Sequence, residues 1–587
     1  MDINQAIKEA AEVFITEQSG TSQKSLNDSV IEALKLYVTD KGGTPANNSI
    51  NDLVNQATAY YFAEQSVSPA PRGNDAVFKA TELYLTAKSE YVPKSFNERL
   101  LASAGYFITN GSDSLAFQGL VANRVRFNNA VSTTQKQFKS RSRHTTTTAV
   151  TELTLAFQNF YIDASTGRER GQAATAKLTA SVEYPSGTYT QVTFEVADRA
   201  SAGVPERALL PAVPSNATTE VGLIFSSPCA VTIPANTDFW VRMFYDNDSG
   251  VPSTGCVYVN GFRDPTATTG DSLQLGASGL TDSTMGGTIS HNASTAYCCP
   301  AAIIGLTDQA SAYLVGDSIM WGQANLTLDT VYSRIGLVAP GFPTTLPFLN
   351  GGSPSFKSSE WLSWSPSRKL LFPYVTTMYN NLGINDTTGA TAADIANYNT
   401  LIAAEFPSRV KKYLCTLTPR VISSSDGYTT IAGQTIHGST TTLYQPYNAL
   451  VRAGVSGYTD YIEMTHGVTE ASPTDSGKLV LSPNNRIVTD AVSNATTTIT
   501  SATMAFTSAD IGYGVRMFGA GVAGANLNGM INSVTDSTTA LLASATSTAV
   551  NPMTMNFGSI SHDGLHFLNA GAALTGAAVP ASTYAYP

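Results

Sequence analysis

A serine, an aspartate and a histidine in this chain have the types and spacing that acyl transfer requires. Ser318 follows the apolar run 313–315 and the pair Gly316-Asp317. The run is short enough for one buried strand of a parallel sheet, so Ser318 is expected at the strand's carboxyl end, where ligands bind in open α/β sheets. Gly-Asp-Ser alone is equally typical of a plain turn.

The partners of such a serine lie near the other end of the chain. Asp563 and His566 are three residues apart, so one loop can present both. A serine hydroxyl is a poor nucleophile near neutral pH, and it needs a base to accept its proton and a carboxylate to orient that base. Ser318, His566 and Asp563 can fill these three roles.

A third motif, Gly383-Ile384-Asn385-Asp386, stands between these two segments. The order Gly-Asp-Ser, a glycine, Gly-x-Asn-Asp and Asp-x-x-His resembles the SGNH (GDSL-type) hydrolases, a family of esterases and lipases, from about Ser311 to the C-terminus. The resemblance implies a Ser318, His566 and Asp563 triad. It also implies an oxyanion hole that consists of the Ser318 N–H, a glycine N–H and the Asn385 side chain.

The glycine of the oxyanion hole is assigned to Gly352, and Gly351 is nearly as good a candidate. Here the chain departs from the family, because the strand expected before the glycine is weak, with Pro343 and Pro347 nearby.

Two site residues have alternatives. Asn385 alone could be a helix cap or a turn residue. His562 competes with His566 as the base, but only His566 has the family's spacing to Asp563. The remaining histidines have no carboxylate or cysteine in ligand spacing and are expected on surfaces or loops: His144, His291, His437 and His466.

Strands that alternate with helices are expected to build a parallel sheet around these motifs. The hydrolase region is expected to resume at about Ala301. Its expected strands are Val375–Tyr379, Lys412–Leu417 and Tyr458–Met464, and its expected helices are Ala392–Phe406 and Leu443–Ala453.

From about Thr146 to Phe262 the apolar pattern has a period of two, which is typical of an antiparallel sandwich or jelly roll. Trp240 lies in an apolar run and is expected in the core, the alternative being a platform for a sugar. The expected strands are Val150–Phe160, Ala176–Tyr184, Tyr189–Val196, Val221–Phe225, Phe239–Tyr245 and Cys256–Phe262.

Residues 472–558 interrupt the hydrolase pattern and are rich in Thr, Ser, Ala and Gly. The stretch from Phe506 to Val515, with Gly519-Ala520-Gly521, resembles a small β module of bacteriophage tailspike and fibre proteins. The segment contains no histidine, so we expect an insertion that shapes a glycan-facing cleft without contributing catalysis.

The first 90 residues contain four related copies that begin at Asn4, Asn27, Asn51 and Asn74. The spacing fits one amphipathic helix and a connector in each copy. The copies predict either a small bundle that spaces domains or a docking module for a larger assembly.

Composition narrows the class of protein. The chain has 587 residues with 42% hydrophobic and 13% charged residues and a net charge of −10, which argues against nucleic-acid and anionic-membrane surfaces. Five cysteines without paired spacing indicate neither a disulfide framework nor a zinc site, and Cys298 and Cys299 are expected as buried thiols. No secretion signal or apolar membrane span is visible, and no cofactor or metal is expected.

The expected fold class is therefore multidomain: N-terminal helical repeats, an antiparallel β-sandwich and an α/β SGNH hydrolase with a flavodoxin-like parallel sheet and an inserted small β module. The expected segments are 1–92 for the helical attachment module, 93–145 for a linker, 146–300 for the sandwich, 301–471 with 559–587 for the hydrolase, and 472–558 for the insertion.

The expected function is that of a virion-associated serine esterase that removes O-acetyl groups from a bacterial surface polysaccharide. The chain would be made in the host cytoplasm and act extracellularly, as a homo-oligomer bound to other virion proteins through its N-terminal helices. The alternatives are a non-catalytic receptor-binding or decoration protein that binds glycans, and a lipase. A lipase would want an apolar acyl groove, whereas the loops near Ser318 and Asn385 are mostly Thr, Asn and Gly.

Overall fold

The computed structural model describes residues 117–584, apart from gaps within that range. The chain divides into two compact units, 1–117 and 118–587, each described by itself. The helical copies predicted within 1–92 lie outside the described residues. The gaps are 123, 128–134, 159, 164, 172–175, 195–196, 199–206, 211–221, 247–269, 292–297, 325–333, 423–425, 466 and 470–476.

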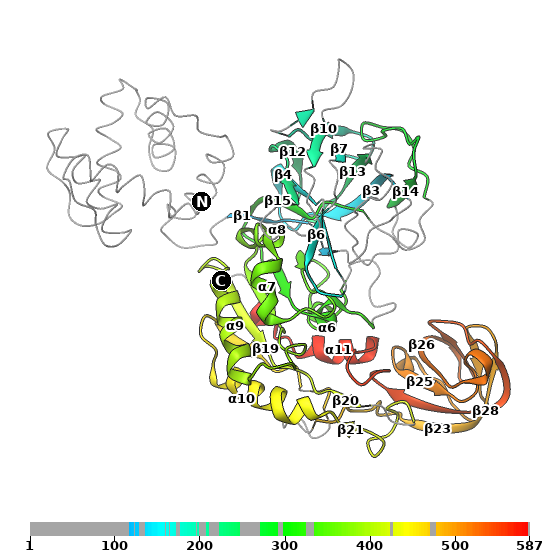
Figure 1. Ribbon diagram of the computed structural model, residues 1–587. Helices are drawn as coiled ribbons and strands as arrows, with labels where there is room; N and C mark the ends of the chain where they lie inside the picture. The colour runs from blue at the N-terminus through cyan, green and yellow to red at the C-terminus, as the bar shows by residue number, and fades with distance from the viewer. Residues whose placement is uncertain are drawn as a thin grey trace, which may run out of the picture. The chain divides into compact units, whose positions relative to one another are not determined.

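An antiparallel sandwich forms the first part of the described chain (Figure 1). Its five-stranded sheet consists of β1 (Phe117–Leu120), β15 (Ala302–Thr307), β4 (Val150–Gln158), β11 (Leu223–Phe225) and β12 (Cys229–Ile233). Its seven-stranded sheet consists of β14 (Ser272–Gly276), β3 (Gln137–Thr145), β13 (Asp238–Asp246), β7 (Ala176–Glu183), β10 (Arg207–Leu210), β9 (Ala197–Asp198) and β8 (Tyr189–Gln191).

The two sheets enclose one core. Side chains with a period of two point inward, as in β12, where Cys229, Val231 and Ile233 are buried and the residues between them are exposed. Phe157 of β4 and Phe239 of β13 belong to the same buried cluster. Five of the six expected strands coincide with observed ones, and the sixth, Cys256–Phe262, lies outside the described residues.

Three features of this region bear on the predictions made from the sequence. Ile303 of β15 pairs antiparallel with Leu155 of β4, so the strand near Ala301 belongs to the sandwich. Trp240 is only partly buried, and Arg141 lies 4.1 Å above its ring. Cys298 and Cys299 are buried, as expected.

A six-stranded parallel sheet follows, in the order β2 (Arg124–Arg126), β17 (Phe348–Asn350), β16 (Ala312–Val315), β18 (Thr377–Asn380), β19 (Lys411–Cys415) and β22 (Asp460–Ile462). All its neighbouring strands run parallel. Its helices are α6 (Ser318–Trp321), α7 (Ser358–Trp364), α8 (Pro366–Lys369), α9 (Ala392–Ala404), α10 (Gln445–Ala453) and α11 (Asn569–Ala577). The three strands and two helices expected beyond residue 370 are confirmed, with each boundary within two residues of the expected one.

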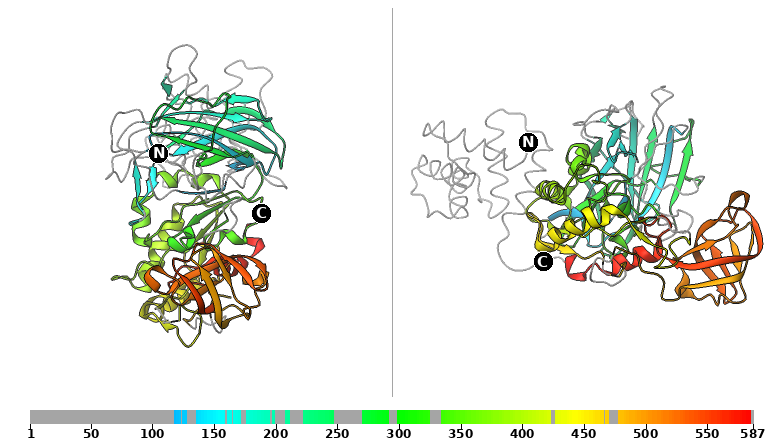
Figure 2. Two further views of the ribbon diagram at one scale, coloured as in Figure 1. Left: turned by 90° about the vertical axis from the view of Figure 1, so that its right-hand side faces the viewer. Right: turned by 60° about the horizontal axis from the view of Figure 1, so that its bottom comes forward.

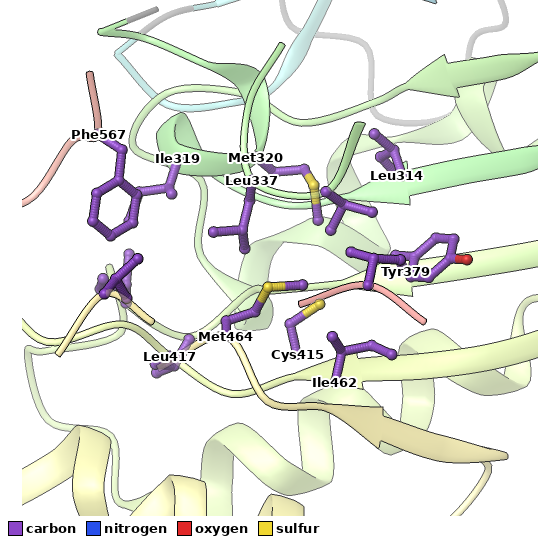
Figure 3. Close-up of a cluster of buried hydrophobic side chains, with 14 of the residues drawn as sticks. Leu314, Ile319, Met320, Leu337, Tyr379, Cys415, Leu417, Ile462, Met464 and Phe567 are labelled. Atoms are coloured by element: carbon purple, nitrogen blue, oxygen red, sulfur yellow. The ribbon is translucent and has the colours of Figure 1, made fainter. Parts of the chain in front are cut away.

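Strand β16 is buried on both faces, which explains its unbroken apolar sequence. Leu314 faces a cluster that also holds Ile319, Met320 and Phe567 (Figure 3). Tyr313 faces a second cluster with Trp361 of α7 and Phe160, which belongs to the hairpin β5 (Phe160–Ile162) and β6 (Glu169–Gly171). The sandwich region and the parallel sheet therefore share a core.

A closed barrel occupies the region of the expected insertion (Figure 2, orange). Around the barrel the order is β23 (Arg486–Asn494), β24 (Thr498–Thr500), β27 (Thr539–Leu542), β26 (Leu527–Asp536), β25 (Gly514–Met517) and β28 (Ala549–Ser559). Its first and last strands pair, with Arg486 opposite Phe557. The chain thus enters and leaves the barrel at neighbouring points, and a small hairpin, β20 (Val421–Ile422) with β21 (Thr435–Ile436), completes the described strands.

The predicted fold class is wrong. The described residues are mostly β, with 28 strands and six α-helices, two of which have only four residues. The flavodoxin-like α/β domain was inferred from strands alternating with helices, which assumes that helices cover both faces of the sheet. Here Phe160 and Ile162 of a β-hairpin cover part of one face, and two sheets and a barrel supply most of the remaining structure.

Candidate active site

Strand order brings three loops to one edge of the parallel sheet. The chain passes from β16 to β17 on one side, and then to β18 on the other side of β16. Such a reversal opens a crevice at the carboxyl ends of the strands. The loops that meet there carry Ser318, residues 351–356 and Asn385.

Ser318 is the first residue of α6 and is 4% exposed. The Asp317 carboxylate caps the helix by accepting a hydrogen bond from the Ile319 N–H at 2.9 Å. Gly316 is required before this turn, because a Cβ there would lie 2.0 Å from the Asn381 Oδ1 atom.

His566 joins Ser318 to Asp563. Its Nε2 atom lies 2.7 Å from the Ser318 Oγ atom, and its Nδ1 atom lies 2.6 Å from the Asp563 Oδ2 atom. The other oxygen of Asp563 accepts the His566 N–H at 2.8 Å and the Leu565 N–H at 2.9 Å. The structure thus brings together all three residues of the predicted triad from segments 248 residues apart.

The loop of Asp563 and His566 is held by its backbone. Gly564 has a φ of 75°, and its carbonyl accepts the Val421 N–H at 2.9 Å. A Cβ at Gly564 would lie 2.2 Å from the Val421 carbonyl oxygen, so this close approach requires glycine.

Two carboxylates near the serine differ in their electrostatics. Burial opposes the charge of Asp563, but its hydrogen bonds and the attraction of His566 outweigh burial and hold the pKa of Asp563 well below its usual value. Burial raises the pKa of Asp317 to about 6, which its hydrogen bonds with Ile319 and Asn381 only partly offset. Asp563 is therefore the carboxylate suited to stabilise a charged imidazolium.

The expected oxyanion donors differ in their availability. No hydrogen bond from the Ser318 N–H is found among the described residues. The Gly352 N–H donates to the Asn350 Oδ1 atom at 3.0 Å, and the Gly351 N–H donates to the Leu314 carbonyl at 2.9 Å. The Asn385 side-chain amide donates to the Phe356 carbonyl at 3.1 Å.

His562, the competing base, points away from Ser318 into the barrel. Its Nε2 atom lies 2.8 Å from the Gly529 carbonyl oxygen of β26, so this nitrogen carries a proton and donates. The Ala570 N–H at the start of α11 likewise donates to the Gly512 carbonyl at 3.1 Å. The barrel therefore supports the segment on both sides of His566. This supporting role was not predicted from the sequence.

A small pocket of about 10 Å³ lies beside the serine. Ser318, Ile319, Gly336, His566 and Ala572 are among its lining residues. Such a volume holds about one water molecule. Among acyl chains, only the shortest approach this size.

The other described histidines stay away from this site. The surface or loop position expected for His144 is wrong, because His144 is buried in β3 of the sandwich, within 2.8 Å of the Ser142 hydroxyl. His437 accepts the Ser439 N–H. His466 lies outside the described residues. Among the described residues, no group of three or more His, Cys, Asp or Glu side chains is arranged to hold a metal ion.

Two comparisons with known proteins found no match. No family model matches the chain, and no curated protein matches it significantly. No helix in the described part combines the length and apolar character needed to cross a bilayer.

Proposed function

We propose that this chain is a serine esterase, resembling the SGNH hydrolases in its motifs, that removes acetyl groups from an O-acetylated bacterial polysaccharide. One observation carries the proposal. A serine hydroxyl, an imidazole and a carboxylate form a continuous hydrogen-bonded series of 2.7 and 2.6 Å. The first distance is within hydrogen-bond reach of a nucleophile and its base, and the second is within reach of that base and the carboxylate that orients it.

The reaction follows from this series. His566 Nε2 takes the proton of the Ser318 hydroxyl while Oγ bonds to the acyl carbon, and the carbonyl oxygen becomes an oxyanion. When the intermediate collapses, the bond to the leaving sugar oxygen breaks, and that oxygen takes the proton from Nε2. A water molecule then attacks the acyl-serine by the same route, and acetate and free Ser318 result. Asp563 holds the imidazole and stabilises its charge throughout.

The proposed donors to the oxyanion are the Ser318 N–H, the Asn385 amide and a backbone N–H of the loop after β17. If the last is Gly352, it must exchange its bond to Asn350 for one to the oxyanion. One such donor is worth a factor of about 10² to 10³ in rate.

The choice of an acetyl ester rests on the small pocket at Ser318 and His566. The choice of a polysaccharide and of a virion protein rests on the resemblance of residues 506–521 to a phage tailspike module. We propose that the protein acts outside the host cell on the virion, attached to other virion proteins through its N-terminal segment.

The test is ester hydrolysis by the full chain and by two variants. Wild-type protein should release acetate from p-nitrophenyl acetate and from acetylated glycans, and a fluorophosphonate should label Ser318. Ser318→Ala and His566→Ala should each lower kcat by at least about 10³-fold with unchanged circular dichroism. His437→Ala is the matched control and should keep full activity. Full turnover by folded Ser318→Ala protein would refute the proposal.

A further inference from the structure

The loop after β17 uses its first three N–H groups internally. Gly351 donates to Leu314, Gly352 donates to the Asn350 side chain, and Ser353 donates to the Gly316 carbonyl at 3.1 Å. These bonds hold the loop against the turn that precedes Ser318. They also leave those three groups engaged.

The next N–H along the loop is different. Residue 354 is a proline and has no N–H, and no acceptor for the Ser355 N–H is found among the described residues. Ser355 is exposed and has a φ of 62°, a left-handed conformation that is uncommon for a residue with a side chain. Such conformations persist where the surroundings impose them, often at functional sites.

The residues near Ser355 contact two of the site's loops. Ser353, two residues before it, donates its N–H to the Gly316 carbonyl, and the carbonyl of Phe356, directly after it, accepts the Asn385 amide. The segment that carries Ser355 is therefore bonded to the Ser318 turn and to the side chain proposed as an oxyanion donor. Its N–H is the one unengaged backbone donor of residues 351–356 in the described structure.

The loop is braced by a buried ion pair from the sandwich region. Arg368 of α8 is fully buried, and its Nε atom donates to the Glu169 carboxylate of β6 at 2.9 Å. Its Nη1 atom donates to the Gly351 carbonyl at 2.8 Å, and its Nη2 atom donates to the Gly167 carbonyl at 3.2 Å. Because the Gly351 carbonyl and the Gly352 N–H belong to one planar peptide, Arg368 fixes the orientation of the loop's entry.

The same hairpin also contacts the loop's exit. A Cβ on Gly167 would lie 2.4 Å from the Phe356 ring, and the Arg368 guanidinium lies 5.1 Å from that ring. Glu169 is tied further by the Ser367 N–H at 2.8 Å. Both ends of residues 351–356 are therefore held by groups that the triad does not include.

We propose that the Ser355 N–H is the second backbone donor of the oxyanion hole, and that Glu169 and Arg368 are positioning residues that hold its loop in the left-handed conformation. This inference rests on the proposed esterase activity. It replaces a glycine donor with a serine backbone group and makes the sandwich region part of the hydrolytic apparatus.

Replacing single amides by esters tests the donor directly. In the full chain, lactic acid at position 355 removes the N–H and is compared with Ser355→Ala, which keeps it. We expect the ester at 355 to lower kcat by about 10²- to 10³-fold with little change in KM. Glycolic acid at position 352, compared with wild type, should lower kcat by less than about tenfold. A lower kcat with the ester at 352 but not at 355 overturns the assignment. An unchanged kcat with both esters also overturns it.

Paired glutamate variants test the brace. Glu169→Gln should lower kcat by about 10- to 100-fold and weaken binding of a trifluoromethyl ketone, which forms a tetrahedral adduct, with KM little changed. Glu183→Gln is the control, because Glu183 binds Arg141 with two hydrogen bonds of 2.7 and 2.8 Å and is equally buried in the sandwich. Equal kcat values for the two folded variants overturn the positioning role.

Two further measurements keep the outcomes separate. If Glu169→Gln does not fold, Arg368→Lys is the second variant. Lysine keeps the positive charge but lacks the guanidinium that donates to the Gly167 and Gly351 carbonyls, so kcat should fall by the same factor. If wild-type protein shows neither turnover nor fluorophosphonate labelling, the esterase proposal itself is refuted. If wild-type turnover is normal and the ester at 355 leaves kcat unchanged, only the assignment of the Ser355 N–H is refuted.

Discussion

Asp563 is placed to act on the imidazole by charge as well as by geometry, because, despite burial, its hydrogen bonds and the attraction of His566 favour its ionised form and lower its pKa. Asp563→Asn keeps the shape but removes the charge and can present the wrong hydrogen-bonding group to Nδ1. We expect kcat to fall by about 10³- to 10⁴-fold, with a measurable remainder above the uncatalysed rate. Steady-state kinetics on p-nitrophenyl acetate measures this, and an unchanged kcat would show that the carboxylate only shapes the loop.

Asp317 should instead affect how the free energy of unfolding depends on pH. Its Oδ2 atom is buried, and no hydrogen-bond partner for it is found among the described residues, which agrees with a pKa raised to about 6. A raised folded-state pKa means that the native protein binds the proton more tightly than the unfolded chain. The resulting stabilisation is complete below about pH 4 and is lost as the pH rises through about 6.

The corresponding variant is Asp317→Asn, which can still accept the Ile319 N–H. Its free energy of unfolding should depend less on pH between about 4 and 6 than that of wild type. Urea unfolding across that range measures the difference. Parallel pH profiles for the two proteins would contradict the prediction.

Among the elements, the barrel makes contacts that reach the base. In β26, the Gly529 carbonyl accepts a hydrogen bond from the imidazole of His562, which lies four residues before His566. His562→Ala removes a partly buried hydrogen bond worth about 1 kcal/mol, and if that support is lost at the His566 loop we expect kcat on a small ester to fall by about fivefold. His562→Gln, which can donate from its own amide, should recover part of the loss.

The same contacts alter what removal of the barrel should do. A short Gly/Ser linker in place of residues 485–558 should impair small esters and acetylated polysaccharide alike, because the support of the His566 loop is lost with it. Selective loss on the polymer would mean that the barrel acts on substrate alone, as the sequence expectation had it.

The elements around Ser318 could be predicted because their signals are local. An apolar run before Gly316 and a helical pattern near Ala392 depend only on neighbours in sequence. The surface that covers a sheet depends on residues distant in sequence. The joint cluster of Phe160 and Trp361, and with it the fold class, could therefore not be predicted from periodicity.

The residues of the candidate site likewise fall into those that the sequence predicts and those that only the structure shows. Ser318, Asp563 and His566 were found through motif order. Ser355 carries no compositional signal, because its left-handed conformation is normally marked by glycine. The sequence analysis did not single out Arg368, and only its burial beside Glu169 reveals its contacts.

For the whole molecule, residues 1–92 are predicted to attach the enzyme to a larger particle. Their four amphipathic copies contain none of the residues proposed for catalysis. A chain that begins near residue 110 should therefore keep its kcat on small esters but fail to enter particles in a reconstitution assay. Normal incorporation of the shortened chain would leave the copies only a spacing role.

The contacts that complete the site join distant parts of the sequence: Glu169 and Arg368 are 199 residues apart, and Ser318 and His566 are 248 apart. His566 also follows the barrel in the sequence. The barrel strands must therefore be translated before the proposed base exists. A nascent or truncated chain that stops before residue 566 carries the proposed nucleophile without its base, and we expect it to lack esterase activity.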